Sequence, residues 1–132
     1  MTPQTDDPML ARARELALAA MFVALGITVP ILFHAVGLGR TFLPMHLPIL
    51  IGAVVLRPPM AVLVALLTPW ASMLLTGMPP LPMAVVMCIE LGALSAVVST
   101  ARILRVPVWL AVVLGILVRI AVTWGVTTAL AG

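Results

Sequence analysis

Long apolar stretches that run without interruption constrain this chain more than any other feature of its sequence. The first, at about 16–33, is long enough to cross a hydrocarbon core of about 30 Å at 1.5 Å per residue. Hydrophobic residues make up 64% of the chain and charged residues 8%, whereas a soluble domain is about 25% charged. So little polar surface cannot cover a water-soluble globule. The sequence predicts an all-α integral membrane protein.

Breaks at arginine, glycine and proline divide the chain into a bundle of about five transmembrane helices. We expect spans at 16–33, 43–56, 60–75, 83–101 and 106–131. Residues 1–10 are expected to form a polar tail, and 11–132 a single transmembrane helical domain. Pro44 and Pro48 should disrupt the start of the short second span, since proline removes a backbone donor. That span then either begins beside a cavity or is a short helix tilted in thinned bilayer.

Arginine placement indicates how the bundle is oriented. All seven basic residues are arginines, and most of them stand at segment ends, which is the pattern that orients membrane proteins and does not indicate nucleic-acid binding. A cytoplasmic N-terminus puts five arginines on the inner side, namely Arg12, Arg14, Arg57, Arg102 and Arg105. Only Arg40 then falls in an outer loop. We therefore predict a multi-pass protein of a bacterial or archaeal cytoplasmic membrane, in contact with lipid.

Glu90 and Arg119 are two charges inside stretches that otherwise look like membrane. Such charges are costly and usually face the bundle interior, where they pair. Counting 1.5 Å per residue puts both at one depth, roughly 10 Å below the outer boundary, on adjacent antiparallel segments. They either form an ion pair that fixes helix register or line a solute site open to the outside. His46, near the outer end of the second span, either caps exposed backbone or faces the ligand.

Other kinds of site have little support in the sequence. The two histidines, twelve residues apart, have no partner cluster that would suggest a metal site. No serine or cysteine stands in a nucleophile–histidine–acid arrangement, so we do not expect an enzyme. A phosphate-binding GxxxxGK[ST] loop is absent, so no cofactor is expected in this chain, and any ATP would be used by partner subunits.

Small residues recur along the first predicted helix. Ala13 and Ala17 form one small-xxx-small pair, and Ala20 and Ala24 form another. In lipid such a face allows two helices to approach closely. The stripe therefore either packs inside the bundle or docks another membrane subunit.

Three parts of the sequence resemble the S components of energy-coupling factor (ECF) vitamin transporters. They are the run FLPMHLPILIGAVVL at 42–56, the run TPWASMLLTGMPPLPMAVVMCIELGAL at 68–94, and the alanine-spaced first helix. The resemblance covers roughly 17–124. It implies a small helical membrane protein that captures a vitamin or related micronutrient from the outside and works with a transmembrane T component and two ABC ATPases.

The same resemblance implies roles for particular residues. The alanine stripe would dock the T component. The substrate pocket would be formed near the outer side by the loops at 34–42 and 76–82, which contain Arg40 and Met78, together with His46, Glu90 and Arg119. Members usually have six helices, whereas this sequence accommodates about five. The sixth helix is therefore expected to be absent, because the chain is truncated or is a short form. The alternative is that one of the five predicted segments contains two helices.

Two further functions compete with solute capture. One is a structural or assembly subunit of another membrane complex, in which Glu90 and Arg119 lock helix register. The other is a proton-coupled carrier using Glu90, which is disfavoured because such carriers commonly contain repeated halves and no repeat is visible. The charges do not select a solute, since Glu90 suits a cationic or donating ligand and Arg119 suits a carboxylate.

Overall fold

The computed structural model describes residues 7–38 and 45–132, and within them it contains five helices: α1 (Pro8–Ala35), α2 (His46–Val55), α3 (Pro58–Thr76), α4 (Leu81–Ile103) and α5 (Val108–Ala131). Four of these, all but α2, are long and apolar enough to cross a membrane. The prediction of an all-α, multi-pass membrane bundle is confirmed. Each of the five predicted segments contains a single helix in the described residues, so none of them merges two helices.

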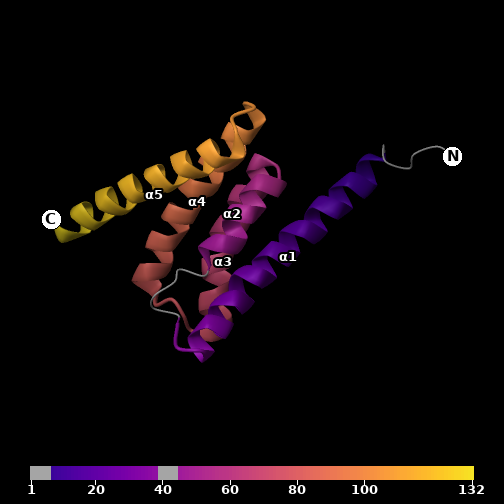
Figure 1. Ribbon diagram of the computed structural model, residues 1–132. Helices are drawn as coiled ribbons and strands as arrows, with labels where there is room; N and C mark the ends of the chain where they lie inside the picture. Colours follow the sequence, from indigo (N-terminus) through magenta and orange to yellow (C-terminus); the bar gives the residue numbers. More distant parts are fainter. Residues whose placement is uncertain (1–6, 39–44) are drawn as a thin grey trace.

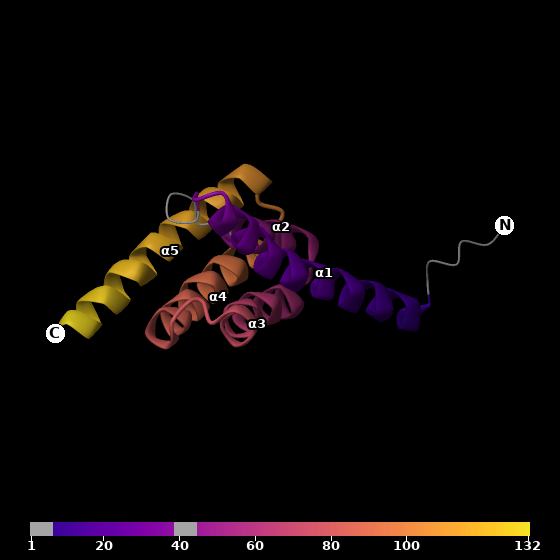
Figure 2. The same ribbon diagram turned by 90° about the horizontal axis from the view of Figure 1, so that it is seen from below.

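Helices α1 to α4 share one apolar core, and α5 lies outside it (Figure 1). The core is built from Ala19, Phe22, Met45, Ile49, Ala53, Leu56, Ala61, Val64, Ala65, Leu91, Leu94 and Val98. Within the described part, α4 is the only helix with which α5 makes a substantial contact. Figure 1 shows α1 and α5 on opposite sides of the other three helices, and the view from below shows the C-terminal half of α5 projecting beyond the rest of the bundle (Figure 2).

The second helix is shorter than predicted. It has 10 residues, about 15 Å at 1.5 Å per residue, so it is too short to cross the membrane by itself. Pro48 lies in its first turn and is buried. A proline is tolerated there because the first backbone N–H groups of a helix have no partner within it. The helix begins at His46, three residues later than the predicted start of the span, with Pro48 in its first turn. Pro44 lies outside the described residues.

The start of the first helix also differs from the prediction. Helix α1 begins at Pro8, inside the segment predicted to be a tail. Asp7 caps it, because its Oδ1 accepts a hydrogen bond from the Met9 backbone N–H at 2.9 Å, and Pro8 occupies a first-turn position that suits proline. At its other end α1 continues through His34 to Ala35, so the exposed His34 belongs to the last turn and not to a loop.

Three chain segments meet at one end of the bundle, which we call the arginine end: the start of α1, the α2–α3 turn and the α4–α5 turn (Figure 1). It carries Arg12, Arg14, Arg57, Arg102 and Arg105, so the predicted grouping of these five residues is confirmed. The end of α1 and the α3–α4 turn lie at the opposite end, which we call the far end.

Candidate functional site

Close packing of α5 on α4 brings the two predicted charges together. Gly115 makes this possible: a Cβ atom at Gly115 would lie 2.6 Å from Val98 Cγ2 and 2.9 Å from Leu94 Cδ1. A glycine lets two helix backbones approach closely in lipid, where little else drives helix association. Arg119 follows one turn later on the same face of α5 and so points at α4.

Glu90 and Arg119 form an ion pair at the α4–α5 contact. Arg119 Nε lies 3.5 Å from Glu90 Oε2, and their side chains are 24% and 8% exposed. Burying two charges costs desolvation free energy. Their attraction offsets this cost only if the charges lie close together and their remaining polar atoms have hydrogen-bond partners. The predicted pairing of these two residues is confirmed. Its role, in holding the helices or in holding a ligand, stays a prediction.

Thr123 joins this pair, and the sequence reasoning missed it. Its hydroxyl lies 2.6 Å from Glu90 Oε1 and 2.9 Å from the Arg119 carbonyl oxygen. The shorter distance identifies the carboxylate as the main acceptor. A signal was present in the sequence, because Thr123 follows Arg119 by four residues and therefore shares its face of the helix.

The carboxylate and the guanidinium are satisfied to different degrees. Glu90 Oε1 accepts a hydrogen bond from Thr123, and Glu90 Oε2 faces Arg119 Nε at ion-pair distance. The buried Arg119 Nε makes no hydrogen bond of good geometry, and its 3.5 Å separation from Glu90 exceeds the 2.7–2.9 Å typical of a charge-assisted bond. Within residues 7–38 and 45–132, the Arg119 guanidinium makes no hydrogen bond. It could therefore donate to an anionic or carbonyl group of a ligand.

Two of the other predicted site residues, His46 and Met78, belong to different elements from this pair. His46 is buried at the start of α2, a helix that also packs on α4. Met78 is 59% exposed in the α3–α4 turn, whose shape is held by the Ser72 hydroxyl donating to the Met78 carbonyl oxygen at 2.9 Å. Arg40 lies outside the described residues. The roles of all three in substrate binding stay predictions.

The alanine stripe faces away from the bundle. Ala13, Ala17, Ala20 and Ala24 are all exposed, whereas the buried residues of α1 are Ala19, Phe22 and Gly26. The alternative in which the stripe packs inside this bundle is therefore wrong. The stripe is available to lipid or to another membrane protein.

Two cavities lined by described residues lie at the arginine end, and neither Glu90, Arg119 nor His46 lines them. The predicted outward-facing cavity would involve the loop at 34–42, much of which lies outside the described residues. That cavity stays a prediction. No group of three or more potential metal ligands occurs in the described part of the chain.

Comparisons with protein-family models, with curated proteins and with solved structures found no match to this chain. The structure itself establishes the class of protein, a multi-pass helical membrane protein. The polar cluster of Glu90, Arg119 and Thr123 is the feature of the described residues that bears most directly on function.

Proposed function

We propose that this protein is the substrate-capture subunit of an ECF-type importer, and that Arg119 with Glu90 forms part of its solute site. The observation that carries the proposal is the Arg119 guanidinium, which faces the Glu90 carboxylate at ion-pair distance but whose buried Nε makes no hydrogen bond. A charge at membrane depth is costly, so a guanidinium with unused donors there is a functional-site candidate.

The chemistry of the pair favours a ligand that accepts hydrogen bonds. An arginine can grip a carboxylate with two parallel hydrogen bonds. Thr123 and Glu90 would hold the arginine in place, since Glu90 faces its Nε at 3.5 Å. A vitamin or related micronutrient with a carboxylate or carbonyl group suits this arrangement, and His46, Arg40 and Met78 would supply further contacts.

Partner subunits would provide the energy for transport. The exposed alanine stripe on α1 offers a flat face for a T component, because small residues let helix backbones approach closely. ATP would be used by ABC ATPases bound to that component, and the chain itself would have neither a cofactor nor an enzymatic activity.

The arginine end supports an orientation for this protein. Five arginines belong to the segments at that end, and positively charged segment ends are favoured in the cytoplasm. In this orientation the N-terminus is cytoplasmic, the membrane is the inner membrane of a bacterium or archaeon, and the far end receives the solute.

Binding measurements on the purified chain test the proposal. The wild type is titrated with a panel of B vitamins in detergent, and Arg119→Gln with any vitamin that binds. We expect one vitamin to bind, and Arg119→Gln to weaken it by at least about tenfold, because a hydrogen bond to a charged group contributes about 1.5–3 kcal/mol. Arg105→Gln, an exposed arginine at the other end of the bundle, serves as control. If no vitamin binds to a correctly folded sample, the proposal fails.

A second candidate is a structural subunit in which Glu90 and Arg119 only lock helix register. The bond from Thr123 to Glu90 favours it, since the carboxylate then has partners without any ligand. Replacing a whole buried pair by apolar residues is often tolerated. This candidate predicts that Glu90→Leu with Arg119→Leu keeps both assembly and function. Loss of solute uptake while assembly persists would favour capture.

A further inference from the structure

The two cavities at the arginine end share one wall, the α2–α3 turn. The first has a volume of about 230 Å³ and lies between this turn and the end of α4. The second, about 660 Å³, lies between the same turn and the start of α1. Val55, Leu56 and Arg57 line both. The turn therefore separates two neighbouring hollows at one end of the bundle.

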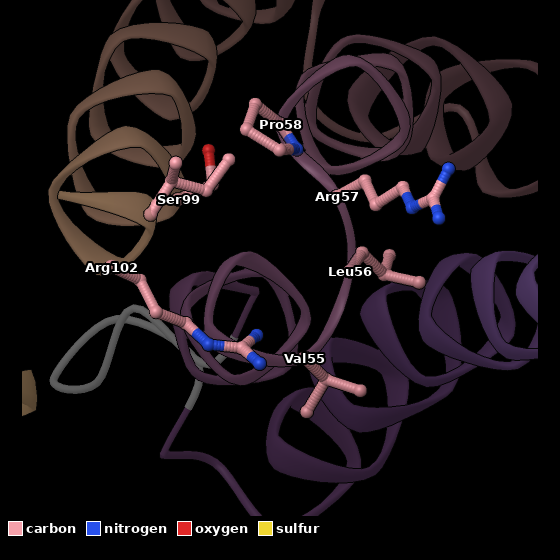
Figure 3. A pocket seen from close by; sticks show the side chains of 7 residues that line it. Val55, Leu56, Arg57, Pro58, Ser99 and Arg102 are labelled. Atoms are coloured by element: carbon pink, nitrogen blue, oxygen red, sulfur yellow. The ribbon is translucent and has the colours of Figure 1, made fainter. Parts of the chain in front are cut away.

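Each cavity carries unneutralised positive charge. Arg102 extends from α4 across the first cavity toward Val55, and the Arg57 side chain points away from Ser99 and Arg102 (Figure 3). Arg57 also lines the second cavity, with Arg12, Arg14 and Glu15. In the part of the chain that the structure describes, none of the four arginines forms an ion pair, because the ion pair present is Glu90–Arg119. Three arginines against one glutamate leave the second cavity positive.

Apolar groups complete both linings. Val55, Leu56 and Ile103 contribute to the first cavity, and Leu10 and Leu18 to the second. Both cavities lie where membrane-crossing helices end, the depth at which lipid headgroups meet acyl chains. A ligand that fits here combines a negative charge with an apolar portion.

We propose that the cavities on either side of the α2–α3 turn bind the headgroups of anionic phospholipids. Basic pockets between transmembrane helices are suited to phosphate headgroups, and arginine recognises phosphate with paired hydrogen bonds. Arg102 with the Ser99 hydroxyl offers donors in the first cavity, and Arg57 with Arg12 and Arg14 in the second. The apolar walls favour a lipid over free phosphate, because acyl chains can cover Leu56 and Ile103.

Lipid titration tests this inference. The full chain in a neutral detergent is titrated separately with short-chain phosphatidylglycerol, short-chain phosphatidylcholine and inorganic phosphate, and binding is followed by calorimetry. We expect phosphatidylglycerol to bind more tightly than either other probe, and more weakly as salt is added, since salt screens charge. Arg57→Gln and Arg102→Gln should each weaken it about fivefold, from about 1 kcal/mol per arginine near an anionic surface.

The control is Arg105→Gln, because Arg105 is exposed at the same end but lines neither cavity. It should change affinity less than twofold. Equal binding of the two lipids, equal losses in the control and the test variants, or tighter binding of inorganic phosphate than of phosphatidylglycerol would each overturn the inference. If Arg57→Gln does not fold, Arg102→Gln and the salt series on the wild type still decide it.

Discussion

The Thr123 hydroxyl donates a 2.6 Å hydrogen bond to Glu90 Oε1 across the α4–α5 contact. A neutral side chain thereby stabilises a carboxylate held inside the bundle, and Arg119 is left with donors to spare. Thr123 is thus the hydrogen-bond donor to Glu90, while Arg119 contributes charge.

Thr123→Val should destabilise the protein by about 1–2 kcal/mol. The substitution keeps the shape of the side chain but removes a donor to a charged group, and such bonds exceed the small average for hydrogen bonds between membrane helices. Thr127→Val is the matched control, because the exposed Thr127 hydroxyl bonds only to backbone carbonyls of its own helix. Unfolding in mixed micelles with increasing dodecyl sulfate measures both. Equal losses would show that the bond to Glu90 contributes nothing.

Gly115→Ala should push α5 away from α4. The added methyl group would lie 2.6 Å from Val98 Cγ2, and overpacking of this kind costs about 1–3 kcal/mol. Gly125→Ala in the same helix meets nothing within 4 Å and should be neutral or slightly stabilising. The same unfolding assay compares them. A stable Gly115→Ala protein would mean that the α4–α5 contact can relax without loss.

Gly26→Ala should be rescued by a second substitution on α3. A Cβ atom at Gly26 would lie 2.5 Å from Thr68 Cγ2, while the other two nearest Thr68 atoms are 3.6 Å away. Thr68→Ser removes that methyl group and keeps the hydroxyl, which donates to the Val64 carbonyl oxygen. The double variant should therefore be more stable than the sum of the single effects, by about 1 kcal/mol in a double-mutant cycle. If the stability losses of the two single variants simply add in the double variant, the alanine at position 26 does not clash with the Thr68 methyl group.

Ala20→Leu should leave stability within about 0.5 kcal/mol of the wild type, because Ala20 is exposed. If the stripe docks a T component, the same substitution should abolish co-purification of that partner, since a leucine keeps the backbones apart. Ala129→Leu, an equal change at an exposed position of α5, is the control. Unchanged co-purification in Ala20→Leu would remove the stripe from the docking face.

The sequence predicted the long helices and the charge pair well, because both follow from simple physics. Apolar length identifies membrane spans, and counting residues placed Glu90 and Arg119 at one depth. The sequence places Thr123 on the same helix face as Arg119, but a threonine in a membrane helix can also satisfy its hydroxyl on its own backbone, so the shared face alone does not establish the bond to Glu90.

Two other features do not follow from apolar length, one because it is set by local capping and the other because it is set by tertiary packing. Helix α1 starts inside the polar segment 1–10, because the Asp7 cap and Pro8 favour a helix start that composition alone does not reveal. The cavities beside Arg57 depend on how far α1 and α4 separate from the α2–α3 turn, and side-chain packing sets that separation.

The position of α5 outside the shared core has a mechanical consequence. Its buried positions, Ala111 and Gly115, lie in its first half, and no residue from Trp124 to Ala131 is buried. Those last turns cannot unwind in a bilayer, since every freed backbone group would lack a hydrogen-bond partner. Any displacement of α5 must therefore move the helix as a rigid body about its contact with α4, which runs from Ala111 to Thr123. The displacement would be largest at the C-terminal end of α5.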